Sequence, residues 1–213
     1  MTTPSAASVF NPSNGNYPPA VGAFLASVAP IATESYLALA AASTTSIKTA
    51  VASIVAPTTY LAAALTGSIG AGVISPPRNI TITTGGTTAN APASCLITGL
   101  DIQGNVMTES IVPSTSAATV VGAKCFAYVT SIALGASGGT AATVAFGTGA
   151  VVGLASKIAV LATSPAVVNE MVDGVRVLTG TFATPAVSAP FGSYAPATAP
   201  NASHNYVIHY QVG

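Results

Sequence analysis

From Ile47 onward, the chain is a series of short runs rich in β-branched residues, and clusters of Gly, Pro, Asn and Ser separate the runs. Such runs predict β-strands, and many short strands with turn residues between them predict an antiparallel β-sandwich or a jelly-roll-like domain. The expected fold is therefore all-β. The expected strands are residues 47–55, 59–65, 79–84, 94–100, 106–112, 125–134, 142–146, 151–154, 174–181 and 206–212.

The last run alternates between two faces, as a half-buried strand does. The face expected in the core carries Tyr206, Ile208, Tyr210 and Val212, and the other face carries Val207, His209 and Gln211. A hairpin is expected between the runs at 94–100 and 106–112. The connection contains Gln103, Gly104 and Asn105, which are residue types that favour a tight turn.

The N-terminal part of the chain differs from the rest. Residues 1–30 contain five of the fifteen prolines, and proline removes a backbone donor and fixes its φ angle. We therefore expect an extended N-terminal arm at residues 1–45, followed by a β domain at residues 46–213. Within the arm, residues 33–45 are rich in Ala and Leu. They predict either a short helix capped by Thr33 or an extended segment, and the sequence leaves both open.

Charge is scarce. Asp, Glu, Lys and Arg make up 5% of the chain, whereas about 25% is typical of soluble domains, and five bases balance five acids. A monomer normally relies on surface charge to resist association. Either the surface is covered by Ser, Thr, Asn and Gly, or partners bury much of it, and both cases suit an assembly subunit. The scattered bases predict no nucleic-acid binding, which requires Lys and Arg gathered on one face.

The mean hydropathy of +0.66 raises the question of a membrane protein. The uncharged stretches at 49–77 and 126–156 are interrupted by Gly, Pro, Ser and Thr, which makes them poor spanning helices. The N-terminus also lacks a basic segment followed by an apolar one, so no signal peptide is expected. We predict no membrane partner.

A catalytic site is not expected. The two histidines are His204 and His209, and the carboxylate nearest to them in the sequence is Asp173. A nucleophile requires an activating base and a group that orients it, and no Gly-x-Ser-x-Gly motif is present. His209 lies on an alternating strand, where a surface or interface position is expected. We therefore predict that the protein is not an enzyme.

Two pairs of carboxylates deserve comparison with glycosidase sites, which use two such groups. Glu170 and Asp173 flank a predicted strand-turn-strand connection, and Asp101 and Glu109 belong to the predicted hairpin. Charges at such turns usually lie in solvent. We expect both pairs to be solvated and not catalytic.

Metal and cofactor sites are not expected either. Cys95 and Cys125 lack the spacing of a metal or redox motif, and we expect two small buried residues rather than a disulfide. No cluster of His, Cys and carboxylates is present. The Gly85-Gly86 and Gly138-Gly139 pairs lack the lysine of a phosphate-binding loop.

Arg78 is an isolated cation between Pro77 and a predicted strand. We expect it to have a structural role, paired with a carboxylate inside the fold or across an interface. Carbohydrate binding is a further alternative, since β-sandwiches often bind sugars through exposed aromatic residues. The chain has no Trp, and Phe191, Tyr194 and Tyr206 are the candidates for such a cluster.

Several motifs succeed one another in a recognisable order between residues 75 and 213. They are PRNITI at 77–82, ITGLDIQGNVMTE at 97–109, GAKCFAYVTSI at 122–132, VAFGTG at 144–149, Leu154 before Lys157-Ile158, and GSYAPATAPN at 192–201 before the strand at 206–210. This order resembles that of tailed-bacteriophage virion proteins, especially head decoration (cement) proteins.

The resemblance implies a non-enzymatic subunit that binds and stabilises the major capsid protein lattice on the capsid exterior of the virion. Such subunits often form homotrimers at threefold positions. Binding the assembled lattice in preference to its separated parts favours the closed shell by mass action. The alternatives are another virion component of the tail, neck or fibre, and a carbohydrate-binding adhesion module.

Overall fold

The computed structural model describes residues 30–70, 72–159, 167–177, 180–183 and 191–213. The described residues form antiparallel strands and two short 3-10 turns, η2 (Ala62–Ala64) and η3 (Thr88–Asn90). The strands are β1 (Ile31–Tyr36), β2 (Lys48–Ala52), β3 (Thr58–Leu61), β4 (Val73–Gly86), β5 (Cys95–Leu100), β6 (Val106–Ile111), β7 (Thr119–Leu134), β8 (Ala142–Gly153), β9 (Val167–Val172), β10 (Val175–Val177), β11 (Thr181–Ala183), β12 (Ser193–Ala195) and β13 (Tyr206–Gln211).

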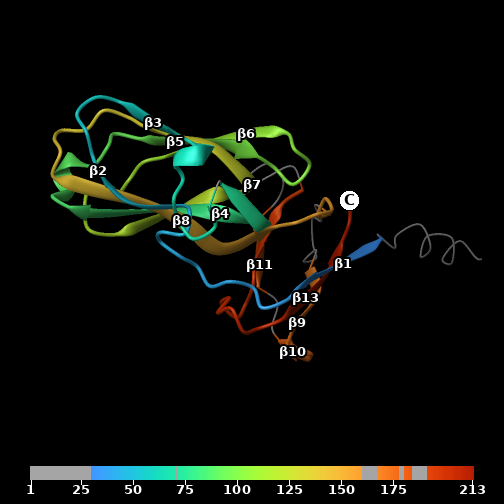
Figure 1. The fold of residues 1–213 in the computed structure, drawn as a ribbon. Helices are drawn as coiled ribbons and strands as arrows, with labels where there is room; N and C mark the ends of the chain where they lie inside the picture. The colour runs from blue at the N-terminus through green and yellow to red at the C-terminus, as the bar shows by residue number, and fades with distance from the viewer. Residues whose placement is uncertain (1–29, 71, 160–166, 178–179, 184–190) are drawn as a thin grey trace, which may run out of the picture. The chain divides into compact units, whose positions relative to one another are not determined.

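These strands form two antiparallel sheets (Figure 1). The larger sheet has nine strands, with the order β11-β12-β8-β4-β7-β5-β6, while β2 pairs with β8 and β3 pairs with β7. The smaller sheet has the order β1-β13-β9-β10. The predicted all-β antiparallel fold is confirmed.

Each sheet has its own apolar cluster. The larger sheet curls around side chains that include Ile80, Phe126 and Phe146, all fully buried. The second cluster joins Tyr206, Ile208 and Tyr210 of β13 to residues of β8 and β12. The alternation expected for residues 206–212 is confirmed over Tyr206–Gln211, where the residues of the predicted core face are buried and those between them are half-buried. Val212, which was predicted on the core face, is half-buried.

The paired strands begin closer to the N-terminus than the predicted β domain at residues 46–213. By its internal contacts, the chain divides into Met1–Pro30 and Ile31–Gly213. Residues 31–36 form β1, which pairs with β13 from Ile31↔Gln211 to Tyr36↔Tyr206. The helix considered for residues 33–45 is therefore wrong, and the extended alternative is confirmed for residues 33–36, which belong to β1. Pairing with a distant strand outweighs the helix propensity of Ala and Leu. The rest of the predicted arm, residues 1–29, lies outside the described residues.

The predicted hairpin is confirmed. Strands β5 and β6 pair without a register shift from Leu100↔Val106 to Cys95↔Ile111. In the turn, Gly104 has a φ of 84°, which glycine adopts without steric cost. The Asp101 carboxylate accepts hydrogen bonds from the backbone N–H groups of Gln103 and Asn105 at 2.8 and 3.0 Å.

Strand β8 joins two runs that were predicted as separate strands, at 142–146 and 151–154. Gly147 lies between them, and it permits a close approach that any other residue would prevent. A Cβ atom added there would lie 1.8 Å from the carbonyl oxygen of Ser43. The glycine therefore marks a place where residues 43–44 cross the strand, and the strand continues beneath them.

Candidate interaction surface

The charged side chains are mostly withdrawn from the surface. Lys48, Arg78, Asp101 and Glu170 are buried, and Glu34, Glu109 and Lys124 are half-buried. The exposed ones are Lys157, Asp173 and Arg176. All ten charges of the chain lie among the described residues, so three of its ten charged side chains are exposed and three more are half-buried.

Many large apolar side chains are exposed at the surface. Thirteen Ile, Leu and Val residues are exposed in the described part of the chain, from 36% for Ile54 and Ile69 to 82% for Leu37. They occur on both sheets, including Val106 on β6, Val121 on β7 and Val175 on β10. Isolated exposed apolar residues are ordinary, but this many with so little charge between them is typical of a surface that contacts partners.

The centre of the larger sheet contains two facing bulges. Between Asn79↔Cys125 and Thr81↔Val121, residues 122–124 of β7 lie opposite the single residue Ile80. Between Arg78↔Val152 and Ile80↔Thr148, residues 149–151 of β8 lie opposite the single residue Asn79. Extra residues in a ladder leave backbone groups without strand partners. Strand β4 is therefore flanked by unpaired backbone groups on both sides.

Asn79 satisfies one group of each bulge. Its Nδ2 donates to the carbonyl of Gly122 at 2.9 Å, and its Oδ1 accepts from the N–H of Val151 at 3.1 Å. The side chain is 1% exposed. Gly149 leaves room for it, because a Cβ at that position would lie 2.4 Å from Asn79 Oδ1. Asn79 thus fixes both bulges at the same level of the sheet.

Arg78 binds the β8 bulge and has no carboxylate partner among the described residues, so the predicted pairing inside the fold is wrong. Its Nε donates to the carbonyl of Gly149 at 2.7 Å, and Nη2 bonds the same oxygen. Its Nη1 donates to the carbonyl of Ala40 at 2.8 Å. Burial lowers the pKa of the guanidinium. The arginine therefore has the structural role that was predicted, with backbone carbonyls as its partners.

Glu109 and Lys124 connect β6 with the β7 bulge. Glu109 Oε1 accepts from the N–H of Ala123 at 2.7 Å, and both carboxylate oxygens lie within 3.4 Å of the N–H of Lys124. In return, Lys124 Nζ donates to the carbonyl of Thr108 at 2.8 Å. Burial raises the pKa of Glu109, while these N–H groups oppose the shift. These bonds give the N–H groups of Ala123 and Lys124, inside the β7 bulge, an acceptor on β6.

The expectation of solvated carboxylates is wrong for three of the four residues. Glu109 is half-buried, Asp101 is 5% exposed inside its turn, and Glu170 is fully buried. Asp173 is exposed, as predicted. Since Glu170 is buried and Asp173 is in solvent, they do not form a paired carboxylate site.

Glu170 points into the core because residues 170 and 172 share the inner face of β9. The carboxylate accepts from the N–H of Gly180 at 2.9 Å, from the N–H of Ala197 at 3.2 Å and from the hydroxyl of Tyr194. Burial, and then the carboxylate, raise the pKa of Tyr194 well above its ordinary value. The carboxylate thus joins β9 to Tyr194 on β12, to Gly180 before β11 and to Ala197 after β12.

Glu34 occupies a similar position on β1. It accepts hydrogen bonds from the hydroxyls of Tyr36 and Tyr210 and from the N–H of Ala155 at 2.7 Å. Burial and the neighbouring carboxylate raise the pKa of both tyrosines well above the ordinary range. These bonds hold β1 to β13 and to the loop after β8, and they use the polar atoms that a ligand would need.

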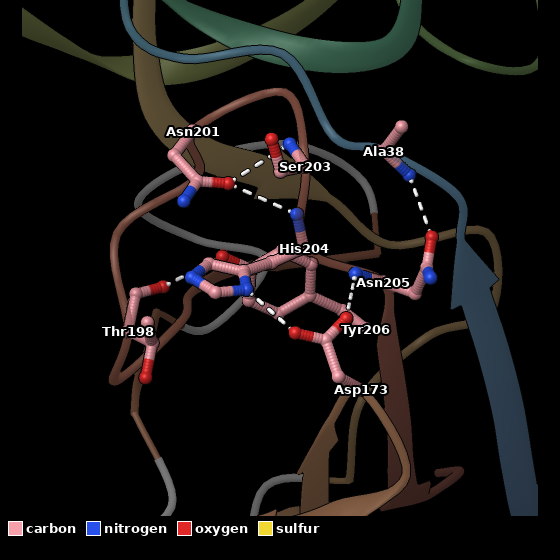
Figure 2. A network of polar contacts seen from close by, with 8 residues as sticks. All are labelled: Ala38, Asp173, Thr198, Asn201, Ser203, His204, Asn205 and Tyr206. Carbon is pink, nitrogen blue, oxygen red and sulfur yellow. Dashed lines mark hydrogen bonds and ion pairs between the residues drawn. The ribbon is translucent and has the colours of Figure 1, made fainter.

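The side chains of His204 and Asp173 are in hydrogen-bond contact (Figure 2), and they form an ion pair when the imidazole is protonated. Their Nδ1 and Oδ2 atoms are 2.6 Å apart, and their side chains are 33% and 47% exposed. The N–H of Asn205, and then His204, hold the pKa of Asp173 below its ordinary value. Asn205 also accepts from the N–H of Ala38 at 2.9 Å. The network joins the β9–β10 turn to the segments before β13 and after β1.

All three non-glycine residues with positive φ in the described part of the chain lie at this network: Ala38 at 45°, Asp173 at 52° and Ala202 at 65°. Hydrogen bonds hold them there, including one from the Ala202 N–H to the Leu39 carbonyl at 2.8 Å and one from the Asp173 N–H to the Asn205 carbonyl at 2.9 Å. Left-handed backbone strains residues with a Cβ atom. The tight junction explains this strain without a catalytic role.

The described residues offer no cluster of metal ligands. No group of three or more His, Cys, Asp or Glu side chains is placed to hold an ion in this part of the chain. His209 is half-buried, in a row between Thr33 and Asn169 across three strands. Cys95 and Cys125 are free and buried, as predicted, and burial raises the pKa of each thiol to about 12.

The candidate aromatic cluster for sugar binding is not exposed. Tyr194 and Tyr206 are buried at 0% and 1% exposure, and Phe191 is half-buried. The Tyr206 hydroxyl donates inward, to the carbonyl of Thr198 at 3.1 Å. Tyr194 and Tyr206 belong to the second apolar cluster, which packs against the smaller sheet.

Searches of family models, curated proteins and solved structures found no match to the chain. Among the described residues, no helix has the length and apolar character needed to span a membrane. A function for the chain must therefore be argued from the geometry of its strands and surface, together with the motif order of its sequence.

Proposed function

We propose that the protein is a non-enzymatic capsid decoration protein, which binds the major capsid protein lattice on the exterior of a tailed-phage head. The observation that carries the proposal is the surface. In the described part of the chain it combines thirteen exposed large apolar side chains with three exposed charges. Such a surface favours association with partners over a monomeric state.

The placement of the other charges supports a structural role. Glu34, Glu109, Glu170 and Arg78 bind backbone groups that the sheets leave unpaired. Their polar atoms hold the fold and are not presented to a substrate. The protein would act through the area of its contacts, as an assembly subunit does.

The proposed mechanism is mass action. A subunit that binds the closed lattice and not its separated parts stabilises the closed state by about 2.7 kcal/mol per site when its free concentration is 100 times its Kd. A homotrimer would multiply this effect, because one molecule would then hold three neighbouring contacts. The β sheets supply a rigid body for such a clamp.

The test is to mix the purified protein with expanded heads that lack decoration. We expect saturable binding and a higher temperature of head disruption. Single Val→Asp changes at Val55, Val106 and Val175, three exposed residues in separate parts of the chain, would locate the binding face. Substitutions that leave binding intact are the matched controls. Absence of binding, or attachment to tails instead of heads, would overturn the proposal.

A further inference from the structure

An uncharged groove lies over the two bulges of the larger sheet. Its volume is about 340 Å³. Val121 of β7 and Val151 of β8 line its sides, Asn79 and Thr81 of β4 lie between them, and Ala42 and other residues of the crossing segment contribute the rest. None of its lining residues carries a charge. Val121 is 58% exposed, although it forms part of an apolar recess.

The groove is held in place by bonds that do not depend on a ligand. Asn79 ties both bulges together beneath it. The crossing segment is anchored at Ser43, whose N–H donates to the Thr148 carbonyl at 2.8 Å and whose carbonyl accepts from Thr81 Oγ1 at 3.0 Å. A preformed groove spares an incoming segment the cost of opening one. A smaller groove of about 180 Å³ shares the residue Val151 with it.

The chain itself contains a segment with matching chemistry. Residues 1–29 include no charged residue, and they carry apolar side chains at Val9, Phe10, Val21, Phe24 and Leu25. A segment free of charge can enter an uncharged groove without leaving an unpaired ion there. A protein that presents such a groove and such a segment can bind a second copy of itself.

The length of the segment permits this. Fully extended, 29 residues span roughly 100 Å. A domain of fewer than 200 residues is about 40 Å across. We propose that residues 1–29 of one copy bind in the groove of a second copy. The inference deepens the proposed homo-oligomer and rests on it, because it names the surface and the segment that join the subunits.

The first test is self-association of the full chain, measured by sedimentation. Val121→Asp places a charge in the groove, and the exposure of Val121 lets the fold tolerate it. We expect at least tenfold weaker self-association. The matched control is Val106→Asp, a change of the same type at a residue that is 76% exposed and does not line the groove. Equal weakening by both variants, or by neither, would overturn the proposal.

The second test identifies the segment and the copy that supplies it. Chains with Val121→Cys are mixed with chains that carry Phe10→Cys or Phe24→Cys, and a bis-maleimide is added. The native thiols are buried, so they compete little. We expect a covalent product of two chains in the mixtures. Chains that carry Val121→Cys together with one of the other changes are treated in the same way, to detect crosslinks within one chain. Crosslinks found only within single chains, or no crosslink with either Phe10→Cys or Phe24→Cys, would contradict binding to a second copy.

These tests are separate from the test of head binding. Self-association without binding to heads would refute the proposed function and leave this inference standing. Binding to heads by a chain that remains monomeric would do the reverse.

Discussion

Asn79 offers the most direct test of how the larger sheet is held together. Asn79→Ala removes the hydrogen bonds to Gly122 and Val151 at a position that is 1% exposed. One buried acceptor and one buried donor then lack partners, and each costs about 1–3 kcal/mol. With the small cavity left by the side chain, we expect a loss of about 3–5 kcal/mol in the free energy of unfolding.

Urea denaturation at neutral pH measures this loss as a shift of the midpoint with an unchanged slope. At about 2–4 °C per kcal/mol for a domain of this size, the melting temperature should fall by roughly 10 °C. The control is Thr83→Ala, which removes an exposed hydrogen bond between Thr83 and Thr119 from the same strand. Its loss should stay below about 1 kcal/mol. An equally small loss for Asn79→Ala would show that the bulges persist without the side chain.

Three further predictions concern the smaller sheet and its junctions. Glu170→Ala should cost more than about 3 kcal/mol in urea denaturation, because it leaves buried donors unpaired, and Glu170→Gln should cost less, because the amide oxygen still accepts; equal losses would contradict the assignment. Ala202→Gly should raise the free energy of unfolding by up to about 1 kcal/mol, since glycine accepts a φ of 65° without strain, and a decrease would refute the strain. Asp173 has a lowered pKa, so its contribution to stability is present above the unfolded pKa of about 3.9 and is lost as the pH falls through the folded pKa. Asp173→Asn should remove that part of the pH dependence in denaturation between about pH 6 and pH 2, and an unchanged profile would refute it.

The strands were largely predictable because the local residue pattern of each run indicates a strand. Runs of Val, Ile and Thr ended by Gly, Asn or Pro mark β5, β6, β7 and β13. Strands β5, β6 and β13 lie within one residue of their predicted bounds, whereas β7 begins at Thr119 instead of residue 125. The sequence left β1 open between a strand and a helix because its identity depends on β13, at the other end of the chain. No local pattern reports a partner so distant, and the Ala and Leu residues after it pointed towards a helix.

The carboxylates show a second limit. Proximity to a turn suggested solvent for Glu170, but the period of the strand already placed it on the face of Val172, which is buried. The alternation along the strand therefore indicated the burial of Glu170 better than its proximity to the turn did. Asp101 carried a signal too, since an Asp that opens a turn commonly accepts from the N–H groups of the next few residues. The two bulges in β7 and β8 had no signal in the sequence, because they depend on how these strands align with β4.

The scarcity of charge acquires a structural meaning from these positions. Burying a charge is costly unless it finds hydrogen-bond partners, and the buried or half-buried charges of this chain find theirs mainly in backbone groups. Glu109 and Arg78 bind the two bulges, Glu170 binds N–H groups beyond the strand ends, and Lys48 Nζ donates to the Ala64 carbonyl at 2.7 Å and lies 4.4 Å from the ring centre of Tyr60. Charge is thus used where the strand ladders are interrupted, which leaves the outer faces with few charges. A charged partner would therefore find few side chains of opposite charge on these faces. An uncharged apolar partner could cover them while removing few charged side chains from water.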